Sequence, residues 1–190
     1  MNRKSIPMLA AVAATALLLA DAPAFAAGSV NKTFNATASV AAKCVMSNVS
    51  DLAFGAYDPV VTNAATDLQG STSFTLTCTR NAAPTISLSV GNANFGQGLA
   101  AKRAMNNGTT SPAAGNYLSY DLYVPSGAGT SATATPTAAL WGDGTGSTAT
   151  FSPSVPSVAA QTITIFGAVL SGQDVAVGSY TDSVTATVNF

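Results

Sequence analysis

Apolar and polar residues alternate along the last eleven residues of the chain, YTDSVTATVNF. The odd positions from Thr181 to Asn189 are polar, and the even positions are apolar except for Asp182. Successive side chains of a strand point to opposite faces, so the pattern predicts a strand with one buried and one solvated face. Chain ends normally fray, so a strand that finishes on Phe190 needs something to hold it. Its apolar face would comprise Tyr180, Val184, Ala186, Val188 and Phe190.

The same alternation occurs near the other end, in VNKTFNATASV, residues 30–40. Its odd positions are polar, and Lys32 is the only charged residue among its even positions. The pattern fits two roles equally well. The segment could be the first strand of the chain's own sheet, or a spare strand that is delivered to a neighbouring molecule. Its even positions are Val30, Lys32, Phe34, Ala36, Ala38 and Val40.

Several segments between these two also predict strands, separated by connections rich in Gly, Asn and Ala. No segment has the period of an amphipathic helix, and residues 126–156 predict long loops with one or two short strands near Leu140 and Phe151. Seven or eight strands in one domain predict an all-β protein with an immunoglobulin-like β-sandwich. The central segments are a short strand from Cys44, then 71–80, 84–91, 118–124 and 161–170.

The beginning of the chain has the features of an export signal. Arg3 and Lys4 precede an apolar run over residues 6–20, and small residues follow, with a cleavage site expected after Ala26. The apolar run is too short to predict a membrane span. The mature chain would run from Ala27 to Phe190, a length that suits one compact domain.

The composition offers little material for catalysis. The chain has seven basic and eight acidic residues, all of them Asp, with no Glu and no His, so we expect neither a nucleic-acid partner nor a catalytic triad. Asp51 and Asp58 adjoin turn residues, where Asp is favoured for local hydrogen bonds. The WGDGTG stretch, residues 141–146, has one carboxylate where a calcium loop needs several oxygen ligands. Trp141 suits a core position better than a sugar-binding one. We predict no catalytic residue, metal or cofactor.

Cys44 and Cys78 are the only cysteines. An even pair in an exported chain predicts a disulfide, which would close a loop of about 35 residues and contribute roughly 3–4 kcal/mol. A metal site or a redox pair is the alternative reading. Neither has support, because the spacing is long, no CxxC is present and no His could complete a zinc site.

The two alternating ends suggest how the chain could associate. A sandwich whose last strand ends the chain can leave an unpaired sheet edge beside an open apolar slot, which must be covered. A spare strand from another molecule could cover it through main-chain hydrogen bonds, with alternate side chains in pockets. Repeated head to tail, such an exchange does not close on itself and produces a fibre.

The order of several short motifs resembles a known family. An IFGA stretch over residues 165–168 is followed by Gly178, Tyr180 and Asp182 in the pattern G-x-Y-x-D, and by a terminal V-x-F. Nearer the beginning, Cys44 precedes an FG-x-Y-D segment over residues 54–58, and Cys78 ends an F-x-L-x-C strand. In this order, the motifs resemble the spore coat protein U domain of the archaic, Csu-type chaperone–usher pilins.

This resemblance implies an incomplete immunoglobulin-like β-sandwich that lacks its last strand and is completed by donor-strand complementation. Together with the signal peptide expected over residues 1–26, it implies a donor-strand extension over 27–41 and a pilin domain over 42–190. We expect the donor residues to be Val30, Phe34, Ala36, Ala38 and Val40. We expect the acceptor groove to use Val184, Ala186, Val188 and Phe190.

The resemblance further implies a structural pilus subunit that supports adhesion and biofilm formation. Its partners would be neighbouring pilin subunits, a periplasmic chaperone and an outer-membrane usher, and it would pass through the periplasm to an extracellular pilus. The alternative is a secreted spore-coat or surface-layer protein with the same domain. A carbohydrate-binding module or a secreted hydrolase is a third reading, against which the missing His and Glu and the single Trp count.

Overall fold

The computed structural model describes residues 27–91, 103–109, 114–127, 135–153 and 157–190. The predicted signal peptide, residues 1–26, lies outside these ranges. The chain divides into two units, Met1–Ala38 and Ser39–Phe190, and each is described by itself.

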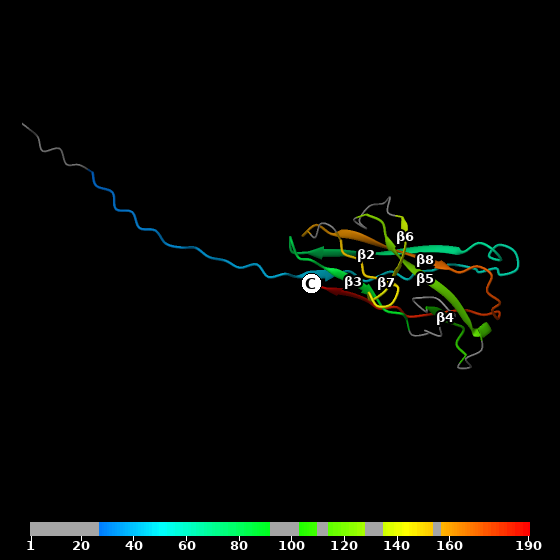
Figure 1. Cartoon of the computed structure of the whole chain (residues 1–190). Helices are drawn as coiled ribbons and strands as arrows, with labels where there is room; N and C mark the ends of the chain where they lie inside the picture. Colours follow the sequence, from blue (N-terminus) through cyan, green and yellow to red (C-terminus); the bar gives the residue numbers. More distant parts are fainter. Residues whose placement is uncertain (1–26, 92–102, 110–113, 128–134, 154–156) are drawn as a thin grey trace, which may run out of the picture. The chain divides into compact units, whose positions relative to one another are not determined.

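The second unit is built from β-strands, and the prediction of an all-β protein is confirmed (Figure 1). Among the described residues the one helical element is a three-residue 3-10 turn, η1, and no helix is long and apolar enough to span a membrane. The elements are β1 (Cys44–Met46), β2 (Leu68–Cys78), β3 (Thr85–Leu88), β4 (Ala104–Asn106), η1 (Ala114–Asn116), β5 (Tyr117–Pro125), β6 (Pro136–Trp141), β7 (Thr148–Ala149), β8 (Gln161–Val169) and β9 (Ala186–Asn189).

The strands form two sheets. The larger has the order β1-β2-β8-β5-β6-β7, with β4 also paired to β5, and the smaller consists of β3 and β9. All pairs are antiparallel except β6 with β7, so the larger sheet is mixed. The long pairing of β2 with β8, from Leu68–Val169 to Leu76–Gln161, brings together segments about ninety residues apart. In this order β1 lies at one edge of the larger sheet, and β9 lies at an edge of the smaller one.

One hydrophobic core joins the two sheets. Phe74, Leu76 and Cys78 of β2 are buried, as are two hydrophobic residues of β3 and four of β8. These are Ile86, Leu88, Ile163, Ile165, Ala168 and Val169. Trp141 is fully buried, its ring meets that of Phe151 edge to face at 5.5 Å, and its indole N–H donates to the carbonyl of Ile86 at 3.0 Å. The core position predicted for Trp141 is confirmed.

The last segment keeps its predicted faces but is less regular than a continuous strand. Residues 182, 184, 186 and 188 are half-buried and the odd positions between them are exposed, yet only Ala186–Asn189 is a strand, paired with β3. Residue Thr181 makes a single bridge to Asn106. Between Thr181 and the start of β9, the Asp182 carboxylate accepts the N–H of Ser183, and the Ser89 hydroxyl accepts the N–H of Thr185. These side chains replace ladder partners and interrupt the strand.

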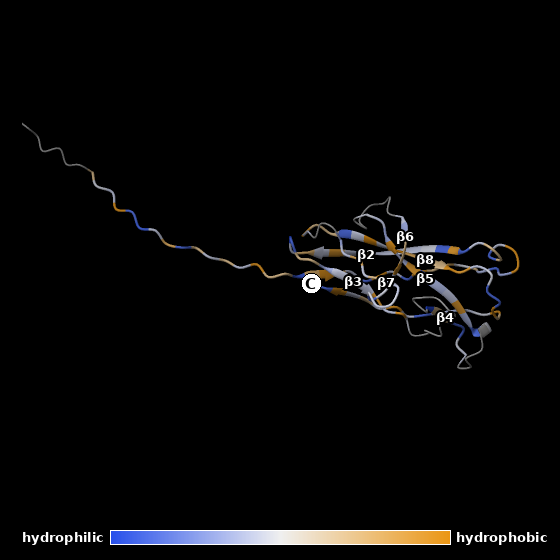
Figure 2. Cartoon of the chain, viewed as in Figure 1, coloured by the Kyte–Doolittle hydropathy of each residue, from blue (hydrophilic) through white to orange (hydrophobic). Residues whose placement is uncertain are grey.

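The first segment differs more from a strand. Residues 30–40 have no assigned secondary structure, although hydrophobic and hydrophilic residues alternate along them (Figure 2). The side chains of Val30, Phe34 and Val40 are 86%, 88% and 83% exposed. The structure thus assigns no strand to this segment.

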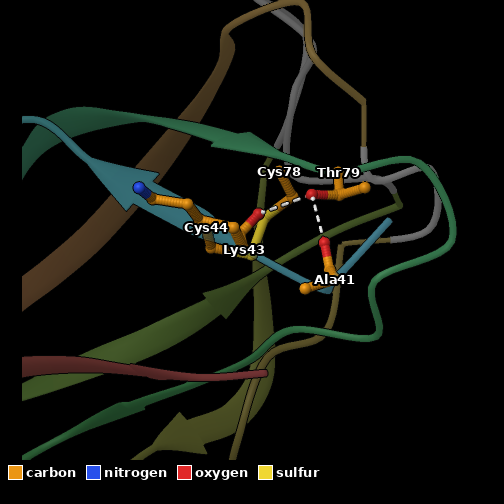
Figure 3. Close-up of a disulfide and its surroundings, with 5 residues drawn as sticks. All are labelled: Ala41, Lys43, Cys44, Cys78 and Thr79. Carbon is orange, nitrogen blue, oxygen red and sulfur yellow. Dashed lines mark hydrogen bonds between the residues drawn. A yellow bond between two sulfur atoms is a disulfide. The ribbon is translucent and has the colours of Figure 1, made fainter. Parts of the chain in front are cut away.

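The two cysteines form the predicted disulfide, which joins β1 to β2 (Figure 3). Cys44 and Cys78 are register partners in this antiparallel pair, with their Cα atoms 4.1 Å apart. Next to the disulfide, the hydroxyl of Thr79 donates to the carbonyls of Ala41 and Lys43 at 3.2 and 3.4 Å. The cross-link fixes the short strand β1, which has few ladder bonds of its own.

Candidate functional site

An open groove lies between two segments of the domain. One side, the first wall, consists of residues 49–57, which follow β1, and the other, the second wall, consists of residues 175–186, which lead into β9. The groove has two adjoining sections of about 450 and 640 Å³, which share lining residues from both walls. Its floor is apolar and comes mainly from Leu118, Tyr120 and Leu122 of β5, Met105 of β4 and Ile165 of β8.

The first wall packs against the larger sheet through the ring of Phe54, which lies over two glycines. Gly70 of β2 and Gly167 of β8 are register partners, and the ring of Phe54 lies over both. A Cβ atom at Gly167 would lie 2.8 Å from Cζ of Phe54, so a larger residue would lift the wall. Phe54 also meets the ring of Tyr120 edge to face at 5.9 Å. The glycine of the IFGA motif is thus explained by Phe54 of the FG-x-Y-D motif.

Polar contacts fix the end of the first wall. The Tyr57 hydroxyl donates to the carbonyl of Leu170 at 2.9 Å. The Asp58 carboxylate accepts the N–H groups of Val60 and Val61 at 2.9 and 3.1 Å, and these hydrogen bonds lower the pKa of Asp58. Asp58 therefore stabilises a turn, as predicted. Asp51 lines the groove instead.

The second wall is held by two tyrosine hydroxyls. Tyr120 on the groove floor donates to Oδ2 of Asp182 at 2.7 Å, and burial raises the pKa of Tyr120, which keeps its hydroxyl a donor. Gly91, at φ 90°, leaves room for the Asp182 carboxylate, because a side chain there would overlap it. Tyr180 donates to the carbonyls of Gly115 and Ala176 at 2.8 and 2.6 Å. The G-x-Y-x-D motif therefore attaches the wall to the domain.

Arg103 is a buried residue near the end of β3 that could not be singled out from the sequence. Arg103 is 1% exposed, and its guanidinium donates to the carbonyls of Leu88 and Ser89, which ties β4 to the end of β3. Burial lowers its pKa, and the nearby Tyr120, Asp121 and Asp182 act in the opposite direction. Among the residues that the structure describes, its Nη1 atom has no hydrogen-bond partner. A single basic residue has no period, so this role could not be predicted from the sequence.

The predicted acceptor residues divide into two groups. Val184 and Ala186 line the groove, whereas Val188 pairs with Ile86 and packs against the core. Phe190 is 58% exposed and lies outside the described groove lining. Sequence reasoning missed the whole first wall as a part of this site. The FG-x-Y-D motif was its only signal, and the motif does not say which surface it faces.

The floor of the groove suits an apolar side chain. Its residues are mostly hydrophobic, and strand addition places alternate side chains of the added strand in pockets of this kind. Over the part of the chain that the structure describes, no three His, Cys, Asp or Glu side chains gather as metal ligands would.

Comparison with known proteins identifies the class of this domain. The model of the Spore Coat Protein U domain family matches residues 30–187, and the chain belongs to that family. Protein U of Myxococcus xanthus is 34% identical over 189 residues, which is 96% of this chain and 96% of that protein.

A solved structure shares the fold. It is a chain of the CsuC–CsuE chaperone–tip adhesion subunit pre-assembly complex from the archaic chaperone–usher Csu pili of Acinetobacter baumannii. The match has a TM-score of 0.50 at 20% identity and covers 80% of this chain, which spans 40% of the length of that one. None of these relatives is named as an enzyme. Spore-coat and pilus proteins are extracellular, and a disulfide suits an oxidising compartment.

Proposed function

We propose that this protein is a structural subunit of an extracellular fibre, a chaperone–usher pilus, and polymerises by donor-strand exchange. One observation carries the proposal: the domain has an open groove with an apolar floor, and the same chain has an alternating segment whose apolar side chains are exposed. In this proposal the groove is the place of a missing last strand of an immunoglobulin-like sandwich. Residues 27–41 of a neighbouring copy would fill it.

The dimensions of the two parts agree. Residues 30–40, fully extended, span about 36 Å at roughly 3.3 Å per residue. The second wall, residues 175–186, has nearly the same number of residues along the groove. A donor strand over residues 30–40 would therefore run along most of this wall.

The energetics are sufficient for a fibre without covalent links. Val30, Phe34 and Val40 would each contribute roughly 1.5–3 kcal/mol on burial, because all three are exposed in the isolated chain. Each main-chain hydrogen bond to a wall would add about 0.5–1.5 kcal/mol. Ala36 and Ala38 would contribute less, but their small size lets the donor backbone approach the floor.

The proposal implies partners for the time before assembly. An uncovered groove is an aggregation hazard, so a periplasmic chaperone would occupy it until an outer-membrane usher exchanges the chaperone for the next subunit. The similar solved structure is itself a chaperone–subunit complex, which supports this route. The finished pilus would serve adhesion and biofilm formation.

Deletion of residues 27–38 tests the proposal. We expect the shortened mature protein, expressed with its chaperone, to form a soluble one-to-one complex that does not polymerise, whereas the full mature chain gives fibres under the same conditions. Native mass spectrometry and electron microscopy would measure the two outcomes. Fibres of normal length from the shortened protein would show that the segment is not the donor.

A second candidate function is a spore-coat or surface-layer protein that assembles without an usher. The identity of 34% to Protein U over 96% of both chains favours it. Neighbouring genes for a chaperone and a large usher would favour the pilus, whereas a lone gene expressed during sporulation would favour the coat. A sugar-binding role loses support because Trp141 is fully buried and cannot stack on a sugar.

A further inference from the structure

The domain has two ends along the eleven residues of β2, about 36 Å apart, and their charges differ in sign. At the disulfide end, Lys43 (Figure 3) and Arg80 adjoin the cysteines in sequence and are exposed. No other exposed basic side chain is found in the described part of the domain. Residues 39–50 and 76–91 contain no acidic residue. The side chains at this end are therefore net positive, and a terminal carboxylate after Phe190 would leave the end positive.

The opposite end, the loop end, is acidic. It consists of loops 58–67 and 170–178, which are joined where the N–H of Ser171 donates to the Asp67 carboxylate at 2.8 Å. These loops contain three acidic residues and no basic one. The acidic residues are Asp58, Asp67 and Asp174. The same loops expose Val60, Val61 and Val177, so this end offers apolar area as well as negative charge.

The chain leaves no slack between the proposed donor segment and the disulfide end. The Thr79 hydroxyl donates to the carbonyls of Ala41 and Lys43, and the Lys43 carbonyl also accepts the N–H of Thr79 at 2.8 Å. The backbone is thus attached to its own domain from Ala41 onward. Val40, the last donor residue, directly precedes it, and consecutive Cα atoms are about 3.8 Å apart. A donor strand that is seated as far as Val40 therefore brings its own disulfide end to the groove that it fills.

Charge and space select the end of the groove at which the donor leaves. The larger section lies at the loop end, where Tyr57, Pro59 and Leu68 line it. Exit at the other end would bring two disulfide ends together, with like charges opposed. It would also crowd three copies at one place, because each copy's own extension begins at its disulfide end. Exit at the loop end sets positive against negative charge and lets the fibre extend head to tail.

We propose that the disulfide end of one copy docks on the loop end of the next, as a second contact beside the donor strand. This inference rests on the proposed donor-strand exchange. The contact brings Lys43 and Arg80 to the acidic loops, and complementary charge orients the two domains. The exposed valines of the loop end lose water at the same junction. Because domains joined by a short segment otherwise move freely, this contact stiffens the fibre.

A spacer in the full mature chain tests the inference. A Gly-Ser-Gly-Ser insertion between Val40 and Ala41 keeps the donor segment and the domain but removes the short connection. We expect fibres whose persistence length is at least about threefold shorter, since a flexible linker lets neighbouring domains move independently. The matched control has the same insertion between Gly28 and Ser29, before the donor segment, and should keep the wild-type persistence length. Electron microscopy of the fibres provides the measurement.

A charge swap makes the test specific. Asp174→Lys opposes like charges across the junction, so it should shorten the persistence length at least about twofold. Arg80→Glu in the same chain should restore it, since the attraction is re-formed with its signs exchanged. The control, Ser147→Lys, adds a positive charge in the exposed turn between β6 and β7, outside both ends, and should have no effect. Circular dichroism would check that each variant is folded.

Salt provides a readout that needs no substitution. The Debye length falls from about 8 Å at 0.15 M to about 3 Å at 1 M ionic strength, which screens charges at an exposed junction. We expect wild-type fibres to become more flexible in 1 M NaCl. Fibres of the spacer variant should not change, because their domains are already independent.

The outcomes separate the inference from the proposed function. Fibres that require residues 27–38 but stay stiff with the spacer, or that the swap does not restore, would overturn the inference alone. Fibres that do not require residues 27–38 would overturn the proposed function itself. Arg80→Glu fibres that keep their stiffness but no longer bind anionic lipid vesicles would mean that the basic end faces a membrane, which would also overturn the inference.

Discussion

Segments 30–40 and 180–190 have the same alternation in sequence and different structures. In the first, Val30, Phe34 and Val40 are all more than four-fifths exposed. In the second, Val184, Ala186 and Val188 are half-buried and pack against the core. The comparison shows that alternation identifies a segment that can bury one face, but does not identify the surface that will cover it.

The second segment is covered because the domain supplies specific attachments. Strand β3 pairs with its end, Tyr120 holds Asp182, and the Tyr180 hydroxyl reaches two carbonyls. In the first segment the side chains of Val30, Phe34 and Val40 are exposed. Under our proposal a second molecule buries them, and the following variants test whether the two segments differ in this way.

The largest effect on the domain is expected from Tyr120→Phe, which removes an attachment of the second segment. The lost hydrogen bond has a charged acceptor, so the free energy of unfolding should fall by about 1.5–3 kcal/mol. Urea unfolding of the mature chain measures this. An unchanged midpoint and slope would mean that Asp182 does not depend on Tyr120 for its position.

A smaller effect is expected from Val188→Ala, and its counterpart in the first segment sharpens the comparison. Val188 is half-buried against the core, so the substitution should lower the free energy of unfolding by about 1–2 kcal/mol. Thr187→Ala, on the exposed face of the same strand, should stay within about 0.5 kcal/mol of wild type. Val40→Ala should leave domain unfolding unchanged and weaken only the fibre. Equal losses from Val40→Ala and Val188→Ala would show that both segments are parts of one domain.

The smallest expected effect is a pH dependence of the free energy of unfolding, which arises from Asp58 in the turn after the first wall. Hydrogen bonds from Val60 and Val61 lower the pKa of Asp58 below its unfolded value, so its contribution to stability is present above about pH 4 and is lost as the pH falls through the folded pKa. Asp58→Asn should be less stable than wild type at pH 6, and the difference should disappear near pH 2. Urea titrations across this range provide the measurement. A difference that stayed constant with pH would exclude an ionised Asp58 as the cause. Segment 30–40 has no carboxylate and should show no such dependence.

Much of the fold could be predicted because it depends on local patterns. The segments that contain β2, β3 and β8 could be predicted as strands from their residue patterns, and the Cys44–Cys78 disulfide follows from an even cysteine pair behind an export signal. The short strand β4 could not be predicted, because three residues do not display a period. The break before β9 depends on side chains of Asp182 and Ser89 that compete for backbone groups.

The sequence by itself determined which residues can form strands, which face of each is apolar, and which cysteines can pair, because these properties depend on residues close together in the chain or on composition. The tertiary structure alone decided that residues 49–57 face residues 175–186 across an open groove. That arrangement depends on contacts between distant segments, such as Phe54 over Gly70 and Gly167, and no local period records them. Alternation fixes the direction of a side chain, whereas its covering surface is fixed by the packing of the rest of the molecule.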